Sequence, residues 1–272
     1  MPKVFANGIN IYYEEHGDPK NPLLILIGGL TRDHTIWSEV LKQEEIKQFR
    51  AIIYDNRGSG QTDQPEGPYS CELFANDLDA LMEKLHVSSA TIVGHSMGGF
   101  VAQYLAAFHP QRVARLVLCS TCIRQSAECI EYLNSRLDLC RRKVPIEQIV
   151  QTALPWLYTS HFLTEDRARQ IIEGVKLMPF PQTYHALEAQ IMACIQHDSR
   201  AILSLITVPT LVLTGKEDRL MTPDTCKELA AQLPSGIFIE LAGAAHMIQM
   251  EKPKELCQII RDFILEKRSK EI

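Results

Sequence analysis

The sequence has no hydrophobic stretch long enough to cross a lipid bilayer. Apolar runs such as Leu23 to Ile27 span five residues, whereas a membrane helix needs about 20. The first ten residues likewise lack the apolar core of a secretory signal peptide. We therefore expect a cytoplasmic protein without a membrane partner.

Positive charge is also scarce. The 272 residues carry 28 Lys and Arg against 33 Asp and Glu, which gives a formal net charge of −5. The densest basic cluster, Arg141 to Lys143, is short and typical of a solvent-exposed helix end. This composition excludes the basic surface on which nucleic-acid binding depends. It leaves open whether the chain is a monomer or a homodimer.

The cysteines lack the regular spacing of a disulfide framework. They lie in apolar or helical contexts, which predicts small buried side chains. Cys119 and Cys122 form one C-x-x-C pair, but there is no second pair and no histidine at ligand spacing. We therefore predict neither a metal site nor a cofactor. The eight cysteines are Cys71, Cys119, Cys122, Cys129, Cys140, Cys194, Cys226 and Cys257.

What the sequence does contain is an alternation of strand and helix patterns. The run Leu23 to Ile27 has no polar face, and a strand that is apolar on both sides is typical of a parallel sheet covered by helices on both faces. Asn7-Gly8, between apolar alternations, predicts a β-hairpin near the start. Further strands are predicted over 51–54, 91–93, 113–119, 208–214 and 237–241, and helices over 36–41, 71–85, 100–109, 223–232 and 253–266.

The alternation stops in the middle of the chain. Residues 122–206 contain no strand-like run, and a series of helices is predicted there, broken at Pro145, Pro155, Pro179 and Pro181. We predict an α/β fold with a doubly wound, mostly parallel eight-stranded sheet and helices on both faces. Residues 1–121 and 207–272 form this predicted core, and residues 122–206 form a helical cap inserted after the sixth strand.

The stretch from Ala90 to His109 predicts a strand, a sharp turn and a helix, with Ser96 at the turn. A turn this tight forces its central residue towards positive φ and crowds the positions two before and two after it, where Gly94 and Gly98 stand. Such a turn exposes the serine hydroxyl and aims the first amides of the helix at whatever the serine attacks.

Two further polar residues follow predicted strands. Asp218 comes directly after 208–214, and His246 stands among small residues beyond 237–241. The order Ser96, Asp218, His246 is that of a nucleophile, acid and base on this topology. In that interpretation the histidine accepts the serine proton, and the aspartate orients and stabilises the imidazole.

Neighbouring residues are weaker candidates for these roles. Glu217 competes with Asp218 for the position of the acid, whereas Asp224 is typical of a charge in the first turn of a helix. His95 adjoins Ser96, but adjacent residues of a strand point to opposite faces. We therefore do not expect His95 to serve as the base.

A glycine-rich loop, Gly28-Gly29-Leu30, follows the strand at 23–27. The tetrahedral intermediate of acyl transfer needs hydrogen-bond donors aimed at its oxyanion, each worth about 3–4 kcal/mol of barrier. The backbone N–H groups of Leu30 and Met97 are the predicted pair of donors.

Together these segments resemble the α/β-hydrolase superfamily over essentially the whole chain. The matching motifs are Gly94-His-Ser96-Met-Gly98-Gly, Asp55-Asn-Arg57-Gly-Ser-Gly60, the segment from Val208 to Asp218, and Gly243-Ala-Ala-His246. The chain is most similar to small esterases, enol-lactonases and C–C hydrolases. The resemblance implies catalytic roles for Ser96, Asp218 and His246 and an oxyanion hole at Leu30 and Met97.

The sequence departs from the family pattern at two positions. Gly28 stands where most relatives have a histidine that anchors the oxyanion loop, and Thr62 stands where relatives often have serine. Ser96 distinguishes the chain from dehalogenases and epoxide hydrolases, which have aspartate as the nucleophile. Met97 argues against aminopeptidase relatives, which usually have tryptophan there.

The predicted cap is expected to supply the substrate pocket. Its large apolar side chains favour a mostly apolar acyl or aromatic substrate, although most of them are expected to form the core of the cap. Arg124, Arg136 and His185 are candidates for binding a substrate carboxylate. The apolar candidates are Trp156, Phe162, Met178, Phe180, Tyr184 and Met192.

These observations predict a serine hydrolase that cleaves a small-molecule carboxylic ester, lactone or thioester through an acyl-enzyme. One alternative is a C–C bond hydrolase or a 3-oxoadipate enol-lactonase-like enzyme of aromatic catabolism. An alternative of another class is a ligand receptor that keeps the pocket but has little or no catalytic activity. The presence of all three predicted catalytic residues weighs against the receptor.

Overall fold

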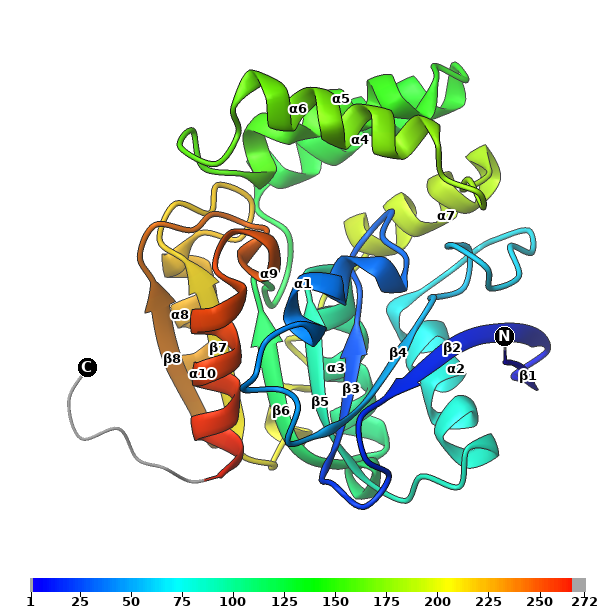
Figure 1. The fold of residues 1–272 in the computed structure, drawn as a ribbon. Coiled ribbons are helices and arrows are strands. Elements are labelled where there is room, and N and C mark those ends of the chain that lie inside the picture. The colour runs from blue at the N-terminus through cyan, green and yellow to red at the C-terminus, as the bar shows by residue number, and fades with distance from the viewer. Residues whose placement is uncertain (1, 266–272) are drawn as a thin grey trace.

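The computed structural model describes residues 2–265, which form one eight-stranded sheet with helices on both faces (Figure 1). The strand order is β1-β2-β4-β3-β5-β6-β7-β8, with β1 and β2 antiparallel at one edge and the other six parallel. The predicted mostly parallel α/β sheet is confirmed. The strands are β1 (Lys3–Ala6), β2 (Ile9–His16), β3 (Leu23–Ile27), β4 (Arg50–Tyr54), β5 (Ala90–His95), β6 (Val113–Cys119), β7 (Thr210–Gly215) and β8 (Gly236–Leu241).

The helices of the core lie in two layers. In Figure 1, α1 and α10 lie in front of the sheet, and α3 and α8 lie behind it. Residues 24–27 of β3 are at most 1% exposed because helices cover both of their faces. The core helices are α1 (Ser38–Leu41), α2 (Cys71–Lys84), α3 (Met97–Phe108), α8 (Pro223–Gln232), α9 (Ile248–Glu251) and α10 (Pro253–Ile264), with 3-10 turns at His34–Trp37, Pro110–Arg112 and Leu203–Leu205.

The predicted N-terminal hairpin is confirmed. Asn7 and Gly8 both have positive φ, at 47° and 79°, which is the backbone of a tight turn matched to the twist of two strands. Ala6 pairs with Ile9 across this turn. The hairpin continues into β2, where Tyr13 pairs with Tyr54 of β4. The edge of the sheet is thus built from the first contiguous segment of the chain.

Some helices and strands begin at other residues than the sequence predicted. The helix predicted over 36–41 begins earlier, as a 3-10 turn at His34, because the Asp33 carboxylate accepts a hydrogen bond from the Thr35 amide (3.0 Å). The strand predicted from 208 begins at Thr210, after Pro209, which has no N–H for the ladder. The last helix ends at Ile264, and its predicted end at residue 266 lies outside the described residues.

Four helices lie between β6 and β7, at the position predicted for the helical insertion (Figure 1). Pro145, Pro179 and Pro181 fall between helices, but the predicted break at Pro155 is wrong. Pro155 lies in the last turn of α5, where a missing N–H removes a single helical hydrogen bond before the helix ends. The helices are α4 (Ala127–Arg141), α5 (Ile146–Leu157), α6 (Glu165–Lys176) and α7 (Tyr184–Ile195). The division of the chain into a core and a cap at residues 122 and 206 stays a prediction.

The two ends of this insertion are fixed to each other and to α3. The Ser199 amide donates to the Ile123 carbonyl (2.9 Å), and the Ser199 hydroxyl donates to Gln103 Oε1 of α3 (2.7 Å). His197 Nε2 lies 3.2 Å from the Cys122 carbonyl oxygen, and its ring stacks on Phe100 of α3 at 3.8 Å between ring centroids. Both connections therefore leave the core from one hydrogen-bonded junction.

A single amide fixes α7 to the core loops. Gln190 Nε2 donates to the Arg57 carbonyl (2.8 Å) and to Ser59 Oγ (2.9 Å). Its Oε1 accepts from the Thr31 amide (3.3 Å) and from Gln182 Nε2 (2.9 Å). In contrast, α6 contains no buried residue. The insertion is thus held tightly through α7 and loosely through α6.

The cysteines occupy the buried positions that their contexts predicted. All eight are buried and have free thiols. Burial raises the pKa of several of these thiols, to about 12 for Cys71, Cys129 and Cys226, because the thiolate is poorly solvated in the core. Within residues 2–265, no helix combines the length and apolarity that a membrane span requires.

We predict that His197 makes the protein sensitive to acid. Burial is the main cause that lowers its pKa to about 4 from the ordinary 6.5, so between these values the unfolded chain binds a proton that the folded chain does not. The contribution of neutral His197 to the unfolding free energy is complete above pH 6.5 and is lost as the pH falls towards 4. Between pH 7 and pH 5, the unfolding free energy of the wild type should therefore fall by about 2 kcal/mol more than that of His197→Gln.

Urea denaturation of the wild type and of His197→Gln at both pH values measures this difference. The carboxylates and His95 titrate in both proteins and cancel from the comparison. An equal loss of stability in the two proteins between pH 7 and pH 5 would contradict the assignment.

Candidate functional site

The predicted turn at Ser96 connects β5 to α3 at the carboxyl end of the sheet. Ser96 has φ 55° and ψ −120°, the positive φ that the sequence predicted. A Cβ on Gly94 would lie 2.3 Å from the Gly98 carbonyl oxygen, and one on Gly98 would lie 2.3 Å from the carbonyl oxygen of Ile27. The turn therefore exists only with glycine at both positions.

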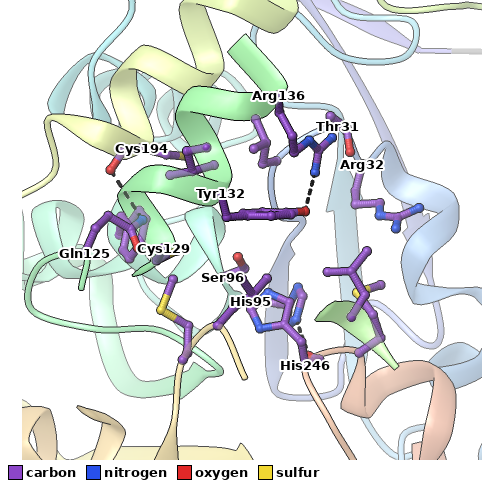
Figure 2. A pocket seen from close by; sticks show the side chains of 18 residues that line it. Thr31, Arg32, His95, Ser96, Gln125, Cys129, Tyr132, Arg136, Cys194 and His246 are labelled. Atoms are coloured by element: carbon purple, nitrogen blue, oxygen red, sulfur yellow. Dashed lines mark hydrogen bonds between the residues drawn. The ribbon is translucent and has the colours of Figure 1, made fainter. Parts of the chain in front are cut away.

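Hydrogen bonds hold the Ser96 backbone in this strained conformation. Its amide donates to the Cys119 carbonyl of β6 (2.9 Å), and its carbonyl accepts from the Gly99 amide (2.8 Å) and from Thr121 Oγ1 (3.0 Å). The backbone is thus fixed on both sides, while the side chain lines a cavity together with His246 (Figure 2). Strain of this kind persists where the surrounding structure over-determines it, as at functional sites.

Asp218 and His246, which follow β7 and β8, form a buried pair. His246 Nδ1 lies 2.9 Å from Asp218 Oδ2, and both side chains are at most 3% exposed. Asp218 Oδ1 accepts from the amides of Leu220 and Met221, both at 2.9 Å. The carboxylate is therefore held as an acceptor facing the imidazole. The weaker candidates Glu217 and Asp224 are both solvent-exposed.

The loop that carries His246 approaches the end of β7 at another glycine. A Cβ on Gly215 would lie 2.4 Å from the carbonyl oxygens of both Ala244 and Ala245. The small residues before His246 therefore allow the loop to cross next to β7, which brings the imidazole beside Asp218. This is the juxtaposition that the order of residues along the chain predicted.

His95 supports His246 in a way that the sequence did not indicate. Its Nε2 lies 2.8 Å from the His246 carbonyl oxygen, and the two rings are 4.9 Å apart. Burial, followed by the charge of His246, lowers the pKa of His95 well below its ordinary value, so this ring is neutral. Since a carbonyl only accepts, the proton is on Nε2. His95 thus holds the backbone of His246.

The glycine-rich loop after β3 passes directly beside Ser96. A Cβ on Gly29 would lie 3.1 Å from Ser96 Cβ and 3.3 Å from His95 Nδ1. Gly29 and Leu30 line the same cavity as Ser96. Asn56 Nδ2 donates to the Gly28 carbonyl at 3.0 Å. This bond anchors the loop at Gly28, where the family resemblance led us to expect an anchoring histidine.

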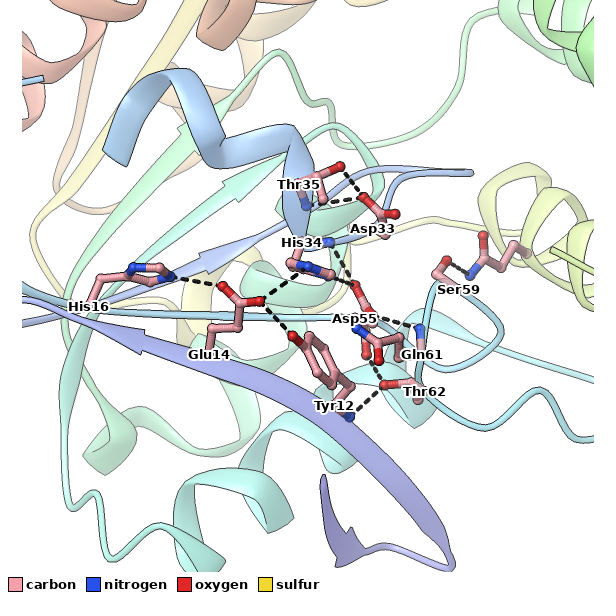
Figure 3. A network of polar contacts seen from close by, with 11 residues as sticks. Tyr12, Glu14, His16, Asp33, His34, Thr35, Asp55, Ser59, Gln61 and Thr62 are labelled. Atoms are coloured by element: carbon pink, nitrogen blue, oxygen red, sulfur yellow. Dashed lines mark hydrogen bonds and ion pairs between the residues drawn. The ribbon is translucent and has the colours of Figure 1, made fainter. Parts of the chain in front are cut away.

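A network of charged groups lies under the continuation of this loop (Figure 3). The buried Asp55 carboxylate accepts from the His34 amide (2.6 Å) and contacts His34 Nδ1 (2.8 Å), while Nε2 of the same ring lies 3.4 Å from Glu14. Burial by itself lowers the pKa of His34, but the hydrogen bond and charge of Asp55, with the charges of Asp33 and Glu14, raise it above its ordinary value. His34 therefore links the loop to β2 and to the residue that follows β4.

The same network explains Thr62 and Gly60. Thr62 Oγ1 donates to the Asp55 carbonyl (2.7 Å) and accepts from the Tyr12 amide (2.9 Å), which a serine hydroxyl in that place could do equally. Gly60 has φ 51°, and a Cβ there would lie 2.3 Å from Asp55 Oδ2. The Asp55–Gly60 motif is thus a structural support for the loop next to Ser96.

Helix α4 covers the cavity above Ser96. This cavity has a volume of about 50 Å³, and α4 contributes Cys129, Tyr132, Leu133 and Arg136 to its wall. A larger cavity of about 630 Å³ shares Thr31 and Arg32 with it and extends under α5 and α6. The site thus consists of a small chamber at Ser96 and a larger one beside it.

The predicted apolar pocket residues lie outside the small chamber. Met178, Phe180 and Tyr184 line the larger cavity. Trp156 lines a separate hollow behind α4, Phe162 stacks on Tyr158 with ring centroids 5.2 Å apart, and Met192 packs half-buried against the core. The reason is that none of these side chains lies on the inward face of α4, which is the part of the insertion above Ser96.

The three residues predicted to bind a substrate carboxylate lie in different parts of the structure. Arg124 is exposed and forms a backbone bridge with Asp198, and His185 Nε2 lies 2.8 Å from the Gln64 carbonyl oxygen. Only Arg136 of these three lines the cavity of Ser96. Tyr132 and Gln125, which line it as well, carry no sequence motif that could have singled them out.

Comparison with known proteins agrees with this arrangement. Residues 22–253 match the family model of the alpha/beta hydrolase fold. The putative carbamate hydrolase RutD of Caulobacter segnis is 27% identical over 258 residues, covering 93% of this chain and 96% of that protein. The 3-oxoadipate enol-lactonase 2 of Acinetobacter baylyi is 26% identical over 249 residues, covering 92% and 91%.

A solved structure agrees over nearly the full length of both chains. The enol-lactonase from Burkholderia xenovorans LB400 superposes with a TM-score of 0.87 at 27% sequence identity, covering 97% of this chain and 100% of that one. The family match extends over most of the chain, from the third strand of the sheet to the start of the last helix. The chain therefore belongs to the α/β-hydrolase family and is a hydrolase.

Proposed function

We propose that the protein is a serine hydrolase that cleaves a small-molecule carboxylic ester, lactone or thioester through an acyl-enzyme. The observation that carries the proposal is the buried pair of His246 and Asp218, 2.9 Å apart, in which His246 lines one cavity with a serine held at positive φ. A serine hydroxyl is a weak nucleophile near neutral pH and needs such a base beside it.

In the proposed reaction, Ser96 Oγ attacks the carbonyl carbon while His246 Nε2 accepts the hydroxyl proton. Asp218 holds the proton of Nδ1 and stabilises the imidazolium that forms. When the tetrahedral intermediate collapses, the imidazolium donates its proton to the leaving group, and the acyl group stays on Ser96. Water then attacks the acyl-enzyme with the same base, which releases the acid.

Two backbone amides are the proposed oxyanion donors. The Met97 amide belongs to the first turn of α3, where helical geometry provides no acceptor within the helix. The Leu30 amide belongs to the loop in which a Cβ added to Gly29 would lie 3.1 Å from Ser96 Cβ. Each donor is expected to stabilise the developing charge by about 3 kcal/mol.

We further propose that residues 122–206 act as a cap over a core of residues 1–121 and 207–272. Helix α4 covers the small chamber at Ser96, and residues before α7 line the larger cavity. In this arrangement the cap supplies the substrate surface, with Met178, Phe180 and Tyr184 as its apolar part. Two of the compared proteins are named enol-lactonases, which favours lactones among the candidate substrates.

Replacing Ser96 with Ala should abolish the proposed activity. Turnover of p-nitrophenyl butyrate is expected to fall by several orders of magnitude, because the nucleophile is lost while the fold is kept. A fluorophosphonate probe should label the wild type and an exposed control, Ser135→Ala, but not Ser96→Ala. Unchanged ester hydrolysis by a folded Ser96→Ala protein, checked by circular dichroism, would refute the mechanism.

Replacing Asp218 with Asn should lower kcat by about 10⁴-fold with little change in KM. The amide oxygen can still accept the two backbone N–H groups, but the amide no longer selects or stabilises the required form of His246. The matched control is Asp224→Asn, an exposed carboxylate at the start of α8. Steady-state kinetics of all three proteins measure the effect, and similar losses in the two variants would argue against the role of Asp218.

A further inference from the structure

Arg136 is a buried cation without an anionic partner. It is 5% exposed, and within residues 2–265 no carboxylate comes within ion-pair distance of its guanidinium. Its Nη1 donates to Tyr132 Oη at 2.8 Å, and its Nε is buried with no acceptor. A buried charge is normally paired, so these unused donors indicate a site for an anion that is not part of the chain.

The charge of the surrounding chamber is suited to such an anion. Two arginines, Arg32 and Arg136, line it together with Ser96 and His246, and no aspartate or glutamate is among its lining residues. Neither arginine forms an ion pair with another described residue. The chamber therefore presents uncompensated positive charge beside the serine.

Tyr132 connects the guanidinium to the space above Ser96. In Figure 2 its ring lies between Ser96 and Arg136, and Arg136 Cζ is 5.5 Å from the ring centroid. Because Tyr132 Oη accepts a hydrogen bond from Arg136, its own proton remains free to be donated. The free proton of the Tyr132 hydroxyl, with the guanidinium charge behind it, is suited to a carboxylate.

We propose that Arg136 and Tyr132 bind a carboxylate at the far end of the acyl group that is transferred to Ser96. The inference rests on the proposed function and names its substrate class: esters, lactones or thioesters of a short acyl chain that ends in a free carboxylate. The small chamber holds about three to five water-sized groups, which limits the acyl part to a few carbons. The larger cavity is left for the leaving group.

Two esters of equal length test this specificity. Monomethyl glutarate and methyl valerate differ only in a terminal carboxylate or methyl group, and proton release at constant pH follows both reactions. We expect the wild type to favour monomethyl glutarate in kcat/KM by at least about tenfold. Arg136→Gln should reduce this preference by about 10- to 100-fold, and Arg136→Lys by less, because lysine keeps the charge but loses the planar donor pair.

The matched control is Arg124→Gln, which removes an exposed arginine next to the same helix and should keep the wild-type preference. A wild type that favours methyl valerate, or an Arg136→Gln protein with the wild-type preference, would overturn the inference. If Arg136→Gln does not fold, as thermal unfolding would show, Arg136→Lys decides by the same criterion.

A binding measurement separates this inference from the proposed catalysis. Calorimetric titration of glutarate into Ser96→Ala requires no turnover, and we expect one bound glutarate whose affinity falls at least tenfold when Arg136→Lys or Arg136→Gln is added. If the wild type hydrolyses neither these esters nor p-nitrophenyl butyrate and the fluorophosphonate probe does not label Ser96, the proposed function fails, yet Arg136-dependent glutarate binding still supports the anion site. Absent glutarate binding, or binding that does not depend on Arg136, overturns the site itself.

Discussion

The geometry of the site depends on how closely three segments approach one another below Ser96. The end of β3, the end of β5 and the start of α3 meet where Gly94 and Gly98 leave no room for a side chain, with ideal Cβ positions 2.3 Å from backbone oxygens. This contact sets the positive φ of Ser96 and places the Gly28–Leu30 loop beside it. It also fixes α3, whose first two turns hold the C-terminal end of the insertion through Gln103 and Phe100.

The three residues proposed to be catalytic share one property, which is that sheet topology alone brings them together. Ser96, Asp218 and His246 each follow a strand of one parallel sheet, and the carboxyl ends of such strands lie at a common edge. The order of the strands along the chain is therefore enough to predict that these three residues lie close together. The strands before Ser96 and Asp218 could be predicted because their apolar runs are buried on both faces.

The chamber above Ser96 could not be predicted in this way. Which face of α4 points at the serine depends on how the insertion packs on the core, and the sequence of a helix fixes the spacing of its faces but not their direction. Large apolar residues such as Trp156 and Phe162 were therefore plausible pocket residues that pack elsewhere. The anchor of the oxyanion loop was likewise hidden, since Asn56 replaces the expected histidine from another loop.

The Gln190 side-chain amide holds one helix of the insertion, α7, more firmly to the core than another, α6. Its two N–H groups and its oxygen make four hydrogen bonds, three of them to the core residues Arg57, Ser59 and Thr31, so moving α7 away from the core would break these three together. Helix α6 buries no side chain and lies over the larger cavity, where displacement breaks little packing. In the proposed cap, outward displacement of α6 would therefore break fewer contacts than outward displacement of α7.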